Sequence, residues 1–100
     1  MKTRVVAGKG LERLENIVNI GPSIGKDLRL IGVRRPADLK GKDPYRLFDK
    51  LCKARGVKQD PCVLDVFIAA VRYMEGGPAR PWYAYTAERK MRFGLRERAS

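Results

Sequence analysis

Apolar residues recur along this chain at the three- and four-residue spacings of amphipathic helices, and residues that start or end helices separate the apolar groups. The pattern predicts five helices, over residues 11–18, 22–31, 44–55, 61–75 and 86–94, with a short helical turn at 36–39. No stretch of useful length alternates apolar and polar residues as a strand does. The chain therefore predicts an all-α fold, a compact bundle of four to five helices.

The ends of the predicted helices carry typical capping residues. An aspartate followed by a proline precedes both the third and the fourth helix, at Asp43-Pro44 and Asp60-Pro61. Gly32 follows the second helix and is a common residue at a helix C-terminus. The fourth helix is apolar on nearly every side, so we expect it at the centre of the bundle.

Length and charge narrow the choice of function. The chain has 100 residues, which favours one domain, and 22 Lys and Arg against 11 Asp and Glu give a net charge of +11. Such a surplus favours a polyanionic partner, although a basic protein that is merely soluble is the alternative. We expect a basic arm at residues 1–10, one domain at 11–94 with a proline-bounded aromatic connector at 78–86, and a frayed tail at 95–100.

Several classes of protein are disfavoured by what the chain contains. No apolar run reaches the ~18 residues of a membrane span, and no apolar segment follows the basic N-terminus as in a secretory signal. There is no histidine, which removes histidine triads and most general-base chemistry. Cys52 and Cys62 are too few for a disulfide scaffold. We therefore expect a cytoplasmic monomer or weak dimer with no membrane partner, no metal and no cofactor.

One short turn suggests a phosphate-binding site. In "IVNIGPSIGKDLRL" the chain turns at Asn19–Gly21 and enters a helix whose first position is Pro22. A helix N-terminus offers unpaired backbone N–H groups and the positive end of the helix dipole, and glycine lets a phosphate approach them closely. Ser23 adds a hydroxyl and Lys26 a positive charge one turn later. This arrangement suits one phosphate held without contact to a base.

The same stretch, "LENIVNIGPSIGKDL", resembles the helix-hairpin-helix motif of DNA-binding proteins. That motif has a glycine–hydrophobic–glycine hairpin followed by a basic helix. The residues of this chain that match it are Ile20, Gly21, Pro22, Ser23 and Lys26. The resemblance implies binding of DNA through backbone phosphates.

Asn19 stands where the motif has its first glycine, and asparagine can also adopt the left-handed conformation. The resemblance further implies a small residue at the helix contact, where Gly25 or its neighbour Ile24 falls. Hairpin carbonyls in this family sometimes hold a monovalent cation, and the matching carbonyls belong to Val18 and Ile20.

A longer resemblance covers residues 11–86. "NIGPSIGKDLRLIGVRRPADLKGKDPYRLFDKLC", "DPCVLDVFIAAVRY" and "PWYAYT" resemble, in order and spacing, the bacterial pathogenicity-locus family of small helix-hairpin-helix proteins, often labelled mitomycin-resistance proteins. The Asn-Ile-Gly-Pro turn is also similar to the C-terminal domain of the competence regulator TfoX. The resemblance implies an all-α, sterile-α-motif-like fold and says little about biochemistry. The third and fourth predicted helices can form a second, degenerate hairpin, because "ARGVKQDP" lacks the glycine–hydrophobic–glycine pattern.

These observations lead to two hypotheses. The first is non-catalytic, sequence-independent binding of duplex, single-stranded or branched DNA, with phosphate-binding residues Asn19, Ile20, Gly21, Ser23, Lys26, Arg29, Arg34 and Arg35. The second is a protein-interaction adaptor that docks a partner on the aromatic connector. A cysteine-dependent enzyme or redox protein is the least favoured interpretation, because no histidine can act as the base of a cysteine.

Two sets of residues permit both a functional and a structural interpretation. Trp82, Tyr83 and Tyr85 can stack on bases, but a segment folded back as a cap over the bundle is the preferred interpretation. Cys62 lies near a predicted helix N-terminus, where the dipole lowers a thiol pKa, yet burial in the core is the commoner outcome for cysteine. The aspartates do not cluster in a metal-binding pattern.

Overall fold

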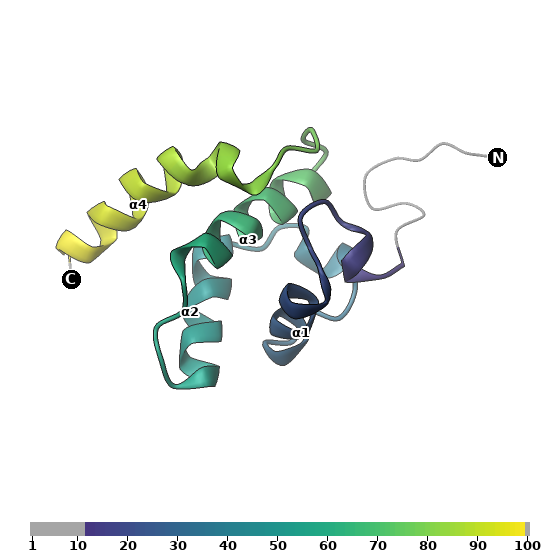
Figure 1. Cartoon of the computed structure of the whole chain (residues 1–100), viewed down its shortest axis with the longest axis horizontal. Helices are drawn as coiled ribbons and strands as arrows, with labels where there is room; N and C mark the ends of the chain where they lie inside the picture. The colour runs from purple at the N-terminus through teal and green to yellow at the C-terminus, as the bar shows by residue number, and fades with distance from the viewer. Residues whose placement is uncertain (1–11, 100) are drawn as a thin grey trace.

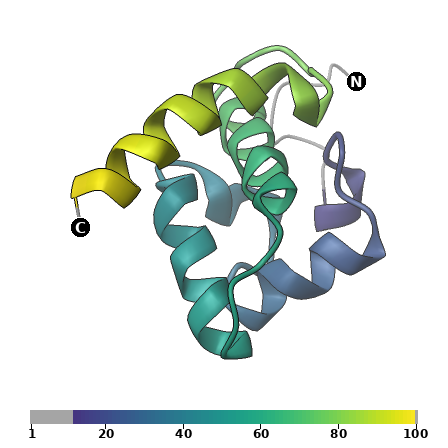
Figure 2. The same ribbon diagram turned by 60° about the vertical axis from the view of Figure 1, so that its left-hand side comes forward.

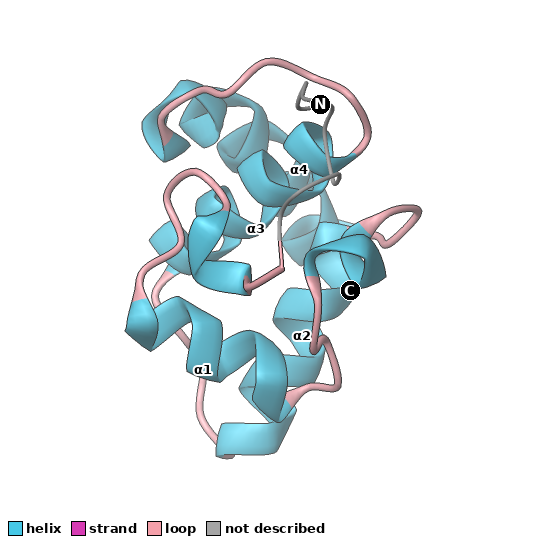
Figure 3. Ribbon diagram, turned by 90° about the vertical axis from the view of Figure 1, so that its right-hand side faces the viewer, coloured by secondary structure: helices cyan, strands magenta, loops and turns pink. Residues whose placement is uncertain are grey.

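The structure, a computed structural model, describes the backbone of residues 12–99 and the side chains of residues 12–92. Within this range it contains helices and no strand, which confirms the all-α fold (Figure 3). The elements follow one another as η1 (Leu14–Asn16), α1 (Pro22–Leu30), η2 (Pro36–Leu39), α2 (Pro44–Arg55), α3 (Pro61–Met74), η3 (Trp82–Tyr85) and α4 (Thr86–Ala99). The basic arm expected at residues 1–10 lies outside the described residues.

Helix α3 forms the centre of the molecule, as its apolar sequence predicts. Every residue from Leu64 to Val71 is buried, and so is Met74. Figure 1 and Figure 2 show α1, α2 and α4 arranged around α3. The other elements contribute buried side chains to the same core, among them Leu14, Ile17, Leu28, Leu39, Leu47, Phe48, Leu51 and Tyr85.

The predicted caps define the two longest helices of the core. Asp43 accepts a hydrogen bond from the backbone N–H of Tyr45, and Asp60 accepts one from that of Cys62, both at 2.9 Å. Each cap contributes about 1 kcal/mol to helix stability. Gly56 ends α2 in the left-handed region, at φ 73°. Helix α2 has the predicted bounds, and α3 ends one residue before the expected end.

The prediction of a helix before the hairpin turn is wrong for residues 12–18, the part of it that the structure describes. Only the single 3-10 turn η1 forms there, and Ile17 is already extended, at φ −79° and ψ 142°. The side-chain oxygen of Asn16 accepts a hydrogen bond from the backbone N–H of Arg13 at 3.1 Å. This bond joins the N-cap residue to the third residue of the turn, so it fixes where η1 begins, and the extended backbone of Ile17 ends it.

Helix α4 continues past Gly94, where we expected it to end, to Ala99. Its start is held to α3 by Asp65, which is 0% exposed and accepts hydrogen bonds at 2.8 Å from the Thr86 hydroxyl and from Nε of Arg89. A buried carboxylate requires such partners, because burial without them is costly. One turn further along α4, the guanidinium of Arg92 lies 4.7 Å from the ring centre of Tyr45 in α2. The last part of α4 extends away from the other helices (Figures 1 and 2).

Candidate nucleic-acid interface

The hairpin turn forms at the predicted position, with Asn19 as its left-handed residue. Asn19 has φ 72°, and among residues 12–99 it is the only residue other than glycine with a positive φ. Gly21 is extended, at φ −99°, so its conformation does not itself require glycine. Ile20 between them is buried in the core and donates its N–H to the carbonyl of Ile17 at 3.1 Å. Asn19 therefore adopts the left-handed conformation at the position where the motif has its first glycine.

Asn19 also connects the turn to a distant part of the chain. Its side-chain amide donates a hydrogen bond of 2.7 Å to the backbone carbonyl of Arg80, in the segment between α3 and η3. The hairpin turn and the aromatic connector are therefore neighbours on the surface. A glycine at position 19 would allow the same backbone conformation but would not make this contact.

The N-terminus of α1 differs from those of α2 and α3 in having no side-chain cap. Gly21 occupies the N-cap position that Asp43 and Asp60 occupy in the other two helices. An added Cβ at Gly21 would meet no atom within 4 Å, so no other group fills the position that a capping side chain would take. Ser23, in the first turn, is exposed. The first backbone N–H groups of α1 are thus accessible to an anion, as the phosphate hypothesis requires.

Two basic residues of α1 have different surroundings. Lys26 is exposed, and no ion pair of Lys26 is present among residues 12–92. Arg29 instead makes two hydrogen bonds of 2.8 Å to the carboxylate of Glu15, and this pairing lowers the pKa of Glu15 to about 2. The charge of Arg29 is therefore balanced within the protein, unlike that of Lys26.

Gly25 makes the contact between η1 and α1 possible. It is buried, and an added Cβ would overlap the carboxylate of Glu15 and lie 3.2 Å from a guanidinium nitrogen of Arg29. The expectation of a small residue at this contact is met by Gly25, while Ile24 is partly buried against the core.

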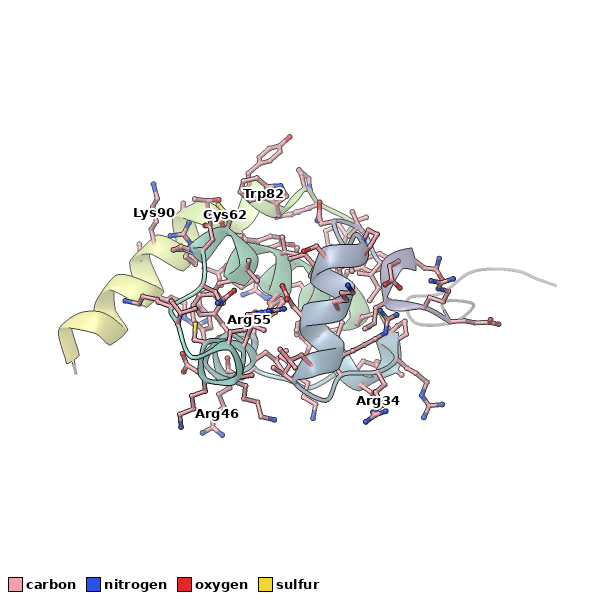
Figure 4. The ribbon with its side chains drawn as sticks, turned by 60° about the horizontal axis from the view of Figure 1, so that its bottom comes forward. Arg34, Arg46, Arg55, Cys62, Trp82 and Lys90 are labelled. Atoms are coloured by element: carbon pink, nitrogen blue, oxygen red, sulfur yellow. The ribbon has the colours of Figure 1, made fainter. Side chains whose placement is uncertain are left out.

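Arg34 and Arg35 lie at the opposite end of α1 from the hairpin turn. Both are exposed and follow the helix C-terminus, and their backbone N–H groups donate to Asp38 at 3.1 and 3.0 Å. A nine-residue helix is about 13 Å long, so these arginines cannot contact the phosphate at Gly21. Figure 4 shows Arg34 and Arg46 at one edge of the molecule and Trp82, Cys62 and Lys90 at the other.

A groove near Arg34 carries charges of both signs. It lies between the C-terminal end of α1, η2 and the N-terminal half of α2. Its basic lining residues are Lys40, Lys42, Arg46 and Lys50, and its acidic ones are Asp38, Asp43 and Asp49. The acidic residues make this groove a poorer match to a polyanion than the hairpin end of α1.

The hairpin carbonyls expected to hold a cation belong to Val18 and Ile20. Among the described residues neither carbonyl accepts a hydrogen bond from a neighbouring turn. Their use by a monovalent cation stays a prediction. No group of three or more Cys, Asp or Glu residues within the described range is arranged to hold a metal ion.

The degenerate second hairpin, at the α2–α3 connection, has an acidic residue where α1 has Gly21. The Asp60 carboxylate accepts the N–H of Cys62, and this hydrogen bond lowers the pKa of Asp60. A carboxylate that already occupies a helix N-terminus repels a phosphate. This second connection therefore does not repeat the features of the first.

The cysteines do not behave as expected from their sequence. Cys62 is exposed rather than buried in the core, and Cys52 is partly buried. Desolvation and the neighbouring Asp60 carboxylate raise the pKa of the Cys62 thiol above its ordinary value. A raised pKa reduces the thiolate fraction at neutral pH, which disfavours a role as nucleophile.

The aromatic connector is only partly a cap. Tyr85 is buried beside α3 and the guanidinium of Arg72 lies 5.5 Å from its ring centre. Trp82 and Tyr83 are exposed by 36% and 66%, and their rings meet edge to face with centres 5.7 Å apart. The preferred interpretation as a cap is therefore correct for Tyr85, holds in part for Trp82 and is wrong for Tyr83.

Sequence reasoning missed several ion pairs that use basic residues inside the fold. Arg55 of α2 pairs with the buried Asp27 of α1, and Arg89 of α4 pairs with the buried Asp65 of α3. Asp65 could have been found from its position within the apolar face of α3, where a charged residue needs a partner. Nothing in the sequence pattern identifies the partner.

Together these features define a small basic all-α protein with one open helix N-terminus behind a tight turn. The pathogenicity locus family model matches residues 7–91, and the chain belongs to this family. Mitomycin resistance protein McrB of Streptomyces lavendulae is 43% identical over 77 residues, which are 77% of this chain and 73% of that protein. Neither name indicates an enzyme activity. No solved structure matches the chain.

Proposed function

We propose that this protein binds DNA without catalysis and without sequence preference, by holding a backbone phosphate at the N-terminus of α1. The single observation that carries the proposal is the open N-terminus of α1, where Gly21 stands in place of a capping carboxylate. Backbone N–H groups, the hydroxyl of Ser23 and the ammonium group of Lys26 suit a phosphate and read no base. A cytoplasmic location stays an expectation; no helix in residues 12–99 is long and apolar enough to cross a membrane.

The experiment is fluorescence anisotropy of a labelled 20-base-pair duplex titrated with the full chain at several salt concentrations. Lys26→Gln is compared with Arg46→Gln, which removes the same charge from α2, in the groove that carries charges of both signs. We expect the slope of log affinity against log salt to fall by about 0.9 for Lys26→Gln, because one phosphate contact is lost. Arg46→Gln should change affinity much less.

Two results would contradict the proposal. Equal losses in the two variants would mean that the net charge of +11 attracts DNA without a defined site. No binding even at low salt would mean that the turn only joins two elements of the bundle. Circular dichroism of both variants checks that the fold is unchanged.

The adaptor hypothesis predicts a different pattern. The exposed rings of Trp82 and Tyr83 are the observation in its favour, since exposed aromatic residues are common at protein interfaces. An adaptor would bind its partner with little dependence on salt and would be insensitive to Lys26→Gln. The charge of the chain and the open helix end favour DNA over this alternative.

A further inference from the structure

We propose that Trp82 and Tyr83 form a stacking platform for unpaired bases, so that the protein prefers a junction of duplex and single-stranded DNA to blunt duplex. This inference rests on the proposed function and specifies its substrate. The two rings stand beside the hairpin turn because Asn19 holds the carbonyl of Arg80, two residues before Trp82. The structure therefore joins the segment that carries this exposed aromatic pair to the turn of the candidate phosphate site.

The exposure of these rings has no explanation in the packing of the core. Tyr85 of the same 3-10 turn is buried and suffices to anchor η3 on α3. Trp82 leaves 36% and Tyr83 leaves 66% of its surface accessible. The rings meet edge to face and are nearly perpendicular, at 83°, so each ring keeps a face that the other ring does not cover. Stacking on aromatic side chains tolerates every base, which agrees with binding that is independent of sequence.

The charge around the rings suits a nucleic acid better than an acidic or apolar protein surface. Residues 17–26 of the turn and 76–87 of the connector contain no Asp or Glu, although the chain has 11 of them. Lys26 and Arg80 are the charged residues of these two segments, and both are exposed. A positive surface with aromatic rings is the usual combination at sites for single-stranded nucleic acid.

The distance between the two sites fits a short single strand. Gly21 and Trp82 are each two residues from the Asn19–Arg80 hydrogen bond, so their Cα atoms lie within about 25 Å of one another. At about 3.4 Å per nucleotide along a strand, this span corresponds to seven nucleotides or fewer. A strand whose phosphate is held at Gly21 can therefore reach the rings with bases a few nucleotides away.

Trp82 is the single tryptophan of the chain, which gives a direct test. The full chain is titrated with a blunt 20-base-pair duplex and with the same duplex carrying a ten-nucleotide oligothymidine overhang. Intrinsic fluorescence and the anisotropy of a DNA label are recorded together. We expect about tenfold tighter binding of the overhang DNA and strong quenching of Trp82 fluorescence, with little quenching by the blunt duplex.

Two variants separate the possible outcomes. Trp82→Ala should lose the preference for the overhang and keep the affinity for blunt duplex, and Trp82→Phe should retain much of the preference. Unchanged fluorescence with saturated overhang DNA, or equal losses on both DNAs in Trp82→Ala, would overturn the stacking platform while leaving the proposed function intact. Loss of all DNA binding in the wild type would instead overturn the proposed function. Binding of both DNAs unaffected by Trp82→Ala would leave the rings to a protein partner. Trp82 is partly buried, so its replacement can change stability. Thermal unfolding of the variants checks that they fold.

Discussion

Replacing Gly21 by aspartate should stabilise the protein and weaken DNA binding at the same time. Gly21 is the N-cap of α1, and Asp43 and Asp60 show that this fold accepts a carboxylate at the same position of α2 and α3. The backbone of Gly21 is extended, and an added Cβ would meet no atom within 4 Å. Gly21→Asp can therefore adopt the cap geometry without strain.

The gain in stability and the loss of DNA affinity can be measured separately. A capping carboxylate in place of glycine contributes a few tenths of a kcal/mol, and its interaction with the helix dipole about 0.3–1 kcal/mol more. For a domain of this size 1 kcal/mol corresponds to roughly 4–8 °C in Tm. The same carboxylate occupies the N–H groups that the phosphate needs. Loss of a charged hydrogen bond worth about 1.5–3 kcal/mol lowers DNA affinity about ten- to a hundredfold.

The assay pairs thermal unfolding with anisotropy of labelled duplex for wild type, Gly21→Asp and Gly21→Asn. The asparagine variant provides a cap of the same shape without charge, so it should lose less affinity than the aspartate variant. Asp60→Asn is the reciprocal control, because it removes a negative charge from the other hairpin. The reasoning is refuted if Gly21→Asp raises Tm and binds DNA as the wild type does, or if Asp60→Asn raises affinity as much as Gly21→Asp lowers it.

Three further predictions concern stability. Asn19→Gly should lower the free energy of unfolding in urea by about 1 kcal/mol, because the hydrogen bond to Arg80 is lost. Asn19→Ala should lower it by about 1–2 kcal/mol more, because alanine is strained in the left-handed conformation. Equal losses in the two variants would contradict this. The pKa of Glu15 is about 2 in the folded protein against an ordinary 4.5. Its contribution to the free energy of unfolding is therefore present above pH 4.5 and is lost as the pH falls towards 2. Glu15→Gln should flatten the fall in stability at acidic pH, measured by urea unfolding at several pH values. Asp65→Asn should cost about 3–5 kcal/mol by calorimetry, because the guanidinium of Arg89, 11% exposed, loses its partner; a cost below 1 kcal/mol would show that α4 is not held by this pair.

Most of the helical core could be predicted because its signals are local. Asp43-Pro44 and Asp60-Pro61 specify where α2 and α3 begin, and the apolar surface of α3 specifies its central place. The errors lie where a signal is weak or depends on distant residues. The helix expected before the turn stops after one 3-10 turn, where Ile17 is extended, and apolar spacing does not reveal this. The glycine penalty near Gly94, about 1 kcal/mol, does not end α4.

The candidate site could be predicted only in part for the same reason. Ser23 and Lys26 lie in the first two turns after Gly21, so helix geometry alone fixes their places along α1, while their contact with a phosphate stays a prediction. Arg29 is close in sequence but bound to Glu15, a contact across the small gap that Gly25 leaves. The link from Asn19 to the connector spans 61 residues, and no local pattern indicates it.

The 22 Lys and Arg residues of this chain therefore overstate the number of separate cations that a ligand meets. Arg29, Arg55, Arg72 and Arg89 are each paired with a carboxylate in the described structure. Each pair removes one positive and one negative charge from the surface, so the net charge stays the same while fewer separate cations remain. What distinguishes the hairpin end of α1 is that residues 17–26 and 76–87 contain no carboxylate, and that the bordering Asp27 and Glu88 are paired with Arg55 and Arg72. A local field of one sign next to open N–H groups favours a phosphate there, whereas a surface of mixed charges, such as the groove beside α2, does not.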